Sequence, residues 1–324
     1  MQASGVSAAR HEAAGLVCFV FSTDAREKRS VEPMPELHMI DSLTDAGHPG
    51  RINEDAHGWN ASAAFVLDGA TTLGPSVAPP PLTDAAWLAG SVSARLRENL
   101  TPPATAAGAL RLAIAGAATR FHEMAGGTLE SGTLEPWRYP VASLLGVRVA
   151  PEGATLFGLG DTVAFIRDGS GATLRWTPAA YGRDNERALA QAALERNNGF
   201  GSAGAAYDEA QALAELRRKR AQRNRPGGSW LVGVVPEAAD HLQVRELDLS
   251  GPVTVLLCTD GFAELVDHYR RHDPESLLEA ALRRGLSSLC AELRHIERQE
   301  DPDGRRYPRF KQSDDATALL ARIG

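Results

Sequence analysis

The sequence has few cysteines, no long apolar run and no excess of positive charge. Its three cysteines, Cys18, Cys258 and Cys290, form neither a CxxC pair nor a cysteine and histidine group. Their spacing excludes a disulfide framework and a structural zinc site and favours a reducing cytoplasm. The apolar stretch at residues 16–21 is too short to cross a bilayer and lacks the basic flank of an export signal. We therefore expect a cytoplasmic protein with no membrane partner.

The charge balance narrows the class of partner further. A formal net charge of -7 argues against a general nucleic-acid binder, because such proteins rely on clustered Lys and Arg. With 324 residues, 43% of them hydrophobic, the chain can bury a sizeable core. Residues 1–36 show no sustained period, and we expect them to form an N-terminal extension. Residues 37–324 are expected to form the main domain.

Seven apolar runs have the length and the flanking turn residues of β-strands. They are 63–67, 143–149, 154–159, 162–167, 230–235, 252–258 and 316–322. Helical spacing predicts amphipathic helices at about 88–100 and 110–121, and a third long helix from the Asp273 and Pro274 cap to Ile296. Because short gaps separate most strands, we expect an α+β fold of antiparallel meanders covered by helices.

The segment from about 181 to 228 combines helical patterns with Gly-rich joints, which predicts an inserted helical flap. It carries a basic run at residues 217–220, together with Arg223 and Arg225. A solvated helix face is the first interpretation of this run, and docking of an acidic or phosphorylated partner is the alternative. His268 and His272, spaced i and i+4, are interpreted as solvated, and Cys258 as a core residue.

Carboxylates stand at the edges of four apolar stretches. They occur at residues 53–55 (Asn-Glu-Asp), 67–69 (Leu-Asp-Gly), 259–261 (Thr-Asp-Gly) and 313–315 (Ser-Asp-Asp). Each alone is more often a turn, but the ends of paired strands hold such residues in place, so that several can converge. Gly after Asp permits close backbone approach and leaves a carbonyl available as an oxygen ligand.

Ligand sets made only of oxygen select hard cations such as Mg²⁺ or Mn²⁺. Two ions about 3.5 to 4 Å apart can share one bridging Asp and activate a water for attack on a phosphate ester. Such chemistry needs no protein nucleophile, and the sequence offers no convincing Ser-His-Asp or Cys-His arrangement. The constellation therefore predicts metal-dependent hydrolysis of phosphate esters.

The motifs resemble those of the protein phosphatase 2C family (PPM-type serine/threonine phosphatases), in a bacterial-like form, over residues 47–321. In family order, they are residues 50–55, 67–69, 160–165, 258–261 and 314–317. The resemblance implies a central antiparallel β-sandwich flanked by helix pairs, a four-layer αββα fold. It also implies that residues 37–324 hydrolyse phosphoserine and phosphothreonine on proteins that serine/threonine kinases have phosphorylated.

The resemblance assigns roles to individual residues. Asp68 would bridge two Mn²⁺ or Mg²⁺ ions, while Asp260 and Asp314 would hold one of them and complete the catalytic set. Glu54 or Asp55 would face the other ion directly or through water. The implied metal-binding residues are Glu54, Asp55, Asp68, Gly69, Asp161, Asp260, Glu264 and Asp314.

Within this set, Asp161 and Glu264 match positions that support a third, weaker ion. The match to the family's phosphate-binding Arg is Arg51, which lies four residues before Asp55, whereas the family spacing is five. Asp315 stands where the family has Asn, and its extra charge would either tighten metal binding or face solvent.

Eukaryotic members of the family place a His, which can protonate the leaving group, where this chain has Ala70. The acid is therefore unassigned, with His48 and His57 as candidates and water as the default. Two other functions remain open. A catalytically inactive scaffold that binds a phosphoprotein has no need of three converging carboxylates, and a two-metal phosphodiesterase would be expected to have a broad basic surface.

Overall fold

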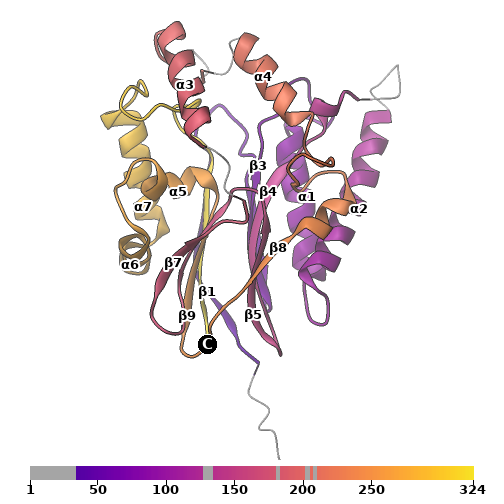
Figure 1. Cartoon of the computed structure of the whole chain (residues 1–324), viewed down its shortest axis with the longest axis vertical. Helices are drawn as coiled ribbons and strands as arrows, with labels where there is room; N and C mark the ends of the chain where they lie inside the picture. Colours follow the sequence, from indigo (N-terminus) through magenta and orange to yellow (C-terminus); the bar gives the residue numbers. More distant parts are fainter. Residues whose placement is uncertain (1–33, 127–133, 180–182, 201–204, 207–209) are drawn as a thin grey trace, which may run out of the picture. The chain divides into compact units, whose positions relative to one another are not determined.

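Two β-sheets packed face to face form the centre of the molecule (Figure 1). The computed structural model describes residues 34–126, 134–179, 183–200, 205–206 and 210–324. Most of the predicted N-terminal extension, residues 1–33, therefore lies outside the described residues. Every strand pairing in both sheets is antiparallel.

The first sheet brings together strands from distant parts of the chain, in the order β1-β10-β9-β6-β7. Their bounds are β1 Leu37–Asp45, β6 Val163–Arg167, β7 Thr173–Trp176, β9 Val253–Cys258 and β10 Ala316–Ile323. The second sheet is mostly a meander, in the order β2-β3-β4-β5-β8. Its bounds are β2 Ala56–Asn60, β3 Ala63–Gly69, β4 Ala142–Ala150, β5 Gly153–Leu159 and β8 Gln243–Glu246.

Helices cover the outer face of each sheet and complete four layers (Figure 1). The pair α1 (Asp84–Asn99) and α2 (Ala106–Gly126) packs on the second sheet, and α5 (Asp260–Asp267), α6 (Pro274–Arg284) and α7 (Leu286–His295) pack on the first. The αββα expectation is confirmed. No helix in the described ranges has both the length and the apolarity to cross a bilayer.

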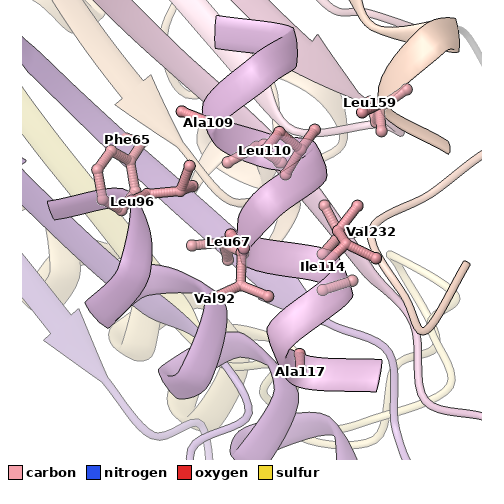
Figure 2. Close-up of a cluster of buried hydrophobic side chains, with 14 of the residues drawn as sticks. Phe65, Leu67, Val92, Leu96, Ala109, Leu110, Ile114, Ala117, Leu159 and Val232 are labelled. Atoms are coloured by element: carbon pink, nitrogen blue, oxygen red, sulfur yellow. The ribbon is translucent and has the colours of Figure 1, made fainter. Parts of the chain in front are cut away.

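Alternation along β3 explains how one strand serves two cores. Phe65 and Leu67 point outward onto α1 and α2 (Figure 2), whereas Ala64 and Val66 point inward against the other sheet. Successive strand residues face opposite sides of a sheet, and burying a side chain such as Phe65 contributes about 1.5 to 3 kcal/mol. Packing on both faces therefore holds β3 in place, and with it Asp68 and Gly69 at the end of the strand.

The predicted flap segment contains two helices, α3 (Arg183–Asn197) and α4 (Ala210–Arg220), which lie beyond one edge of the sheets (Figure 1). Short 3-10 turns span Pro136–Arg138 and Pro236–His241, and a π turn spans Ile296–Glu300. Whether residues 181–228 form a functional insertion stays a prediction.

Two sequence predictions are wrong. Residues 230–235 make only one isolated bridge, from Val232 to Ala142, because Leu231 instead donates its N–H to the side chain of Asn224. The single long helix after Asp273 is broken at Gly285, whose φ of 77° lies in the left-handed region and separates α6 from α7. The Asp273 cap itself is confirmed, including the Pro at the first helical position.

Candidate metal centre and cavity

Three strands bring carboxylates to one edge of the sandwich. Strand β3 ends with Asp68 and Gly69, Asp260 opens α5 directly after β9, and Asp314 precedes β10. The two sheets meet here, because the backbone N–H of Asp260 lies 3.4 Å from Oδ2 of Asp68. Residues 246 positions apart in the sequence are thereby placed at a single site.

A cavity of about 300 Å³ opens at this edge. Six of the eight predicted metal-binding residues line it: Asp68, Gly69, Asp161, Asp260, Glu264 and Asp314. Ser143 on β4 holds one wall by donating its hydroxyl to Oδ1 of Asp161 at 2.7 Å. The cavity therefore concentrates negative charge at the end of stiff, paired backbone.

Asp68 lies at the centre of this charge. Its pKa is raised well above the ordinary value, first by burial and then by the charges of Asp260, Asp55, Asp161 and Asp314. Each neighbour disfavours the ionised carboxylate in the absence of a compensating cation. A divalent ion would remove this penalty, so the electrostatics favour one at Asp68.

The other two predicted ligands do not line the cavity. Glu54 accepts hydrogen bonds from Oγ1 of Thr83 at 2.7 Å and the N–H of Thr72 at 3.4 Å, and burial raises its pKa. Asp55 accepts a 2.8 Å hydrogen bond from Oγ1 of Thr259, and burial followed by the charge of Asp315 raises its pKa. Which of the two serves a metal stays a prediction.

Only glycine fits at position 69, because the backbone of Glu54 lies too close for a side chain. A Cβ atom at this position would lie 2.2 Å from the carbonyl oxygen of Glu54, far inside van der Waals contact. The same holds at Gly261, where a Cβ would lie 2.1 Å from the carbonyl oxygen of Asp315. Both Asp-Gly motifs thus allow backbone segments to pass closely beside the acidic cluster.

The solvent-facing expectation for Asp315 is wrong, because its side chain binds the backbone, and whether its charge also tightens metal binding stays a prediction. Its Oδ1 accepts the N–H of Gly47 at 3.1 Å and its Oδ2 accepts the N–H of Glu54 at 2.8 Å. The side chain therefore ties the segment before β2 to the start of β10. An Asn has only one carbonyl oxygen, so it could offer Oδ1 or Nδ2, but not an acceptor at both positions.

The cavity also has cationic residues outside the acidic motifs. Lys311 forms an ion pair with Asp314; although burial lowers its pKa, the carboxylates of Asp314 and Glu54 raise it overall. Arg187, Arg220, Arg223 and Arg309 also line the wall. Lys311, three residues before Asp314, could have been found by asking which cations flank the acidic motifs. Arg220 belongs to the basic run at residues 217–220, for which docking of a phosphorylated partner is the alternative interpretation, whereas Arg187 and Arg309 require the fold.

The solvated interpretation of residues 217–220 is wrong for two of its arginines. Arg217 donates two hydrogen bonds to the carbonyl of Leu73, at 2.8 and 3.1 Å, and its guanidinium lies 4.2 Å above the Trp137 ring centroid. Arg220 donates to the carbonyl of Thr71 at 3.2 Å. These contacts anchor α4 to the segment that follows β3.

The predictions for Arg51 and for the histidines have different outcomes. Arg51, His48 and His57 are absent from the described cavity wall, and His57 instead stacks on Trp59. The solvated interpretation of His268 is wrong, because its Nε2 atom is buried and its ring packs against Tyr269 and Tyr307.

His272 is not solvated either. Its side chain is only 11% exposed and lies 3.2 Å from Glu292.

The prediction that Cys258 is a core residue is confirmed. Cys258 packs in the core, and burial raises the pKa of its thiol.

The donor chemistry suits hard divalent cations, because the predicted ligands offer only carboxylate and carbonyl oxygens. Within the described residues, no three acidic, histidine or cysteine side chains already stand close enough to share one ion. The fit therefore rests on the oxygen donors and on the crowded charge around Asp68.

Comparisons with known proteins place this geometry in context. A family profile described as protein phosphatase 2C matches residues 44–289, well over half of the chain. No curated protein sequence matches.

Three solved structures illustrate the similarity of this chain to known folds. The catalytic domain of the serine/threonine phosphatase PstP with two manganese ions is 17% identical, with 89% of this chain and 99% of that chain covered and a TM-score of 0.49. PppA of Pseudomonas aeruginosa is 18% identical, with 90% and 98% covered and a TM-score of 0.49. MsPP of Mycobacterium smegmatis, a PPM Ser-Thr phosphatase solved with cacodylate, is 15% identical, with 88% and 98% covered and a TM-score of 0.48.

Proposed function

This chain belongs to the protein phosphatase 2C family, and we propose that it removes phosphate from phosphoserine and phosphothreonine on proteins with the help of Mn²⁺ or Mg²⁺ ions. The observation that carries the proposal is the convergence of Asp68, Asp161, Asp260 and Asp314 on one cavity. The preference for serine and threonine follows from the family. The cytoplasm, where protein kinases supply such substrates, is the proposed location.

Asp68, Asp260, Asp314 and the carbonyl of Gly69 would hold the two catalytic ions. Asp161 and Glu264 would hold a third, weaker ion. When bound, the ions supply an activated water and neutralise charge on the phosphoryl oxygens. The protein contributes position, because such chemistry depends on donors fixed before the substrate arrives.

Supporting side chains perform that positioning. Ser143 orients Asp161 through its hydroxyl, and Lys311 holds Asp314 through its ammonium group. Ala70 lines the cavity at the position where eukaryotic relatives have His, so a water would protonate the leaving group. Ala190 of α3 and Leu216 of α4 contribute apolar wall, against which the residues flanking a phosphorylated side chain could pack.

The proposal is tested with purified protein, p-nitrophenyl phosphate and a phosphothreonine peptide, each with and without Mn²⁺. We expect turnover of both substrates only with the metal, and a loss of about a hundredfold or more in Asp68→Asn and Asp260→Asn, since each removes a group that holds the reacting centre. Asp303→Asn, which removes an exposed carboxylate outside the cavity, is the matched control. Turnover without metal, or unchanged in both cavity variants, would refute the mechanism.

The same assay separates the alternatives. A scaffold would bind the phosphopeptide and release no phosphate under any condition. A phosphodiesterase would cleave bis-p-nitrophenyl phosphate faster than the monoester.

A further inference from the structure

Five cationic side chains line the described part of the cavity: Arg187, Arg220, Arg223, Arg309 and Lys311. These side chains differ in their ion-pair partners. Lys311 is paired with Asp314, and Arg309 lies 2.7 Å from Oδ2 of Asp301. Arg220 differs, because among the described residues it has no carboxylate within ion-pairing distance, and its only acceptor is the carbonyl of Thr71.

Among the described residues, the guanidinium of Arg220 has fewer hydrogen-bond acceptors than N–H donors. A guanidinium carries five N–H donors, and one carbonyl accepts from Arg220. Burial, followed by the positive charge of Arg223, lowers the pKa of Arg220 to about 10, and the charge of Glu54 opposes this shift. The group stays charged at neutral pH, and a partly buried cation of this kind is stabilised by an anion.

The position of Arg220 specifies where such an anion would lie. Thr71, its hydrogen-bond acceptor, is two residues beyond Gly69, so the guanidinium stands against the segment that continues from the proposed metal site. Arg220 and Asp68 line the same cavity. An anion in contact with Arg220 would therefore be adjacent to the acidic cluster and to any cation that the cluster holds.

Helix α4 holds Arg220 in this position. Arg217, one helical turn earlier, is fixed by Leu73 and Trp137, and residues three apart lie on the same face of a helix. The end of α4 is thus anchored at two successive turns to the segment after β3. A side chain on such a support is preorganised for a ligand.

We propose that Arg220 binds the phosphoryl group of the substrate, so that α4 supplies the phosphate contact that relatives take from their N-terminal motif. Arginine is suited to this contact because its planar fork pairs with two phosphate oxygens at once. Arg51, the match by sequence, does not line the described cavity. The inference rests on the proposed phosphatase function for the identity of the anion.

The first experiment measures binding of inorganic phosphate to the full chain by isothermal titration calorimetry in the presence of Mn²⁺. Arg220→Gln should weaken this binding about tenfold or more, the range expected when a charge-assisted contact is lost. Arg218→Gln is the control, because it removes an equal charge from the same helix at an exposed side chain that pairs with Glu215. Arg218→Gln should bind phosphate as the wild type does.

Kinetics supply the second readout. For p-nitrophenyl phosphate, Arg220→Gln should raise KM and the inhibition constant of inorganic phosphate in parallel, and Arg220→Lys should recover part of the loss, because it restores the charge without the planar fork. A purely structural role would lower the melting temperature and leave the inhibition constant of the folded fraction unchanged. Thermal unfolding of each variant therefore accompanies the titrations.

The outcomes distinguish this inference from the proposed function. If the wild type binds phosphate through Arg220 and hydrolyses nothing, the function fails and the site stands. If hydrolysis depends on metal and on Asp68 while Arg220→Gln binds phosphate like Arg218→Gln, the inference is overturned. It is also overturned if Arg51→Gln, rather than Arg220→Gln, weakens phosphate binding.

Discussion

Removing one charge from the acidic cluster should make the metal-free protein more stable. In Asp68→Asn the side chain keeps its size and loses the charge that burial and four neighbouring carboxylates oppose. Two like charges about 4 Å apart repel by about 4 kcal/mol at an effective dielectric constant near 20. Because protonation already relieves part of this repulsion, we expect the free energy of unfolding to rise by about 1 to 3 kcal/mol.

Thermal unfolding in EDTA and in Mn²⁺ measures both halves of the prediction. In EDTA, Asp68→Asn should melt several degrees above the wild type, since about 1 kcal/mol corresponds to about 2 to 4 °C for a domain of 150 to 250 residues. With Mn²⁺ at about a hundred times its dissociation constant, the wild type should gain about 2.7 kcal/mol. Asp68→Asn should lose most of this gain, and Asp303→Asn should behave as the wild type in both solutions.

The difference in stability between Asp68→Asn and the wild type should change with pH in a defined direction. The raised pKa of Asp68 means that the folded protein keeps this proton to higher pH than the unfolded chain, which has its ordinary, more acidic pKa. The penalty from this group is therefore absent below its unfolded pKa and grows as pH rises toward the folded pKa. The advantage of Asp68→Asn in EDTA should shrink as pH is lowered. An equal or lower melting temperature for Asp68→Asn in EDTA, or an undiminished Mn²⁺ response, would contradict the reasoning.

Three further changes test the surroundings of the site. Gly69→Ala should lower the free energy of unfolding by about 1 to 3 kcal/mol, measured in urea, because its Cβ would meet the Glu54 carbonyl at 2.2 Å. Arg217→Ala removes both hydrogen bonds to Leu73, so limited proteolysis should cut α4 faster, while unfolding in urea weakens by about 1 to 3 kcal/mol. The Cys258 thiol, buried and with a raised pKa, should resist iodoacetamide at neutral pH until the protein is unfolded.

The strands that the sequence predicts correctly are those buried on both faces. Strands β4 and β9 are buried along their whole length and are mostly apolar, and mostly apolar runs of this length can be recognised in the sequence alone. Strand β1 has no fully buried residue, and although its exposure alternates along the strand, its sequence does not alternate, because the apolar Ile40 lies on the exposed side. Residues 230–235 are apolar because Val232 packs in the core with α1 and α2, and packing of this kind does not require a strand.

The residues of the site also divide into those that the local sequence pattern indicates and those that only the tertiary structure identifies. Asp68 and Asp260 could be predicted because Asp68 directly follows the apolar residues of β3 and Asp260 lies two residues after the end of β9. The sequence indicates the run at residues 217–220 as a candidate phosphate-docking group, but it could not single out Arg220, because the role of Arg220 depends on where α4 lies against Thr71, a contact that spans 149 residues. Asp315 looked like an extra charge in a motif, and only the positions of Gly47 and Glu54 show that it accepts two backbone N–H groups. Local pattern thus indicates which residues have chemistry, and tertiary contacts decide how they use it.

The electrostatics of the cavity bear directly on whether the chain is an enzyme or a scaffold. A scaffold that recognises phosphate needs cations, and Arg220 would suffice for that purpose. It gains nothing from Asp68, whose neighbouring carboxylates repel both one another and the ligand. Buried like charges lower stability and are typical of sites where function requires them. Cations and carboxylates on the walls of one cavity are therefore better explained by a phosphoryl group held between Arg220 and metal ions than by phosphate binding alone.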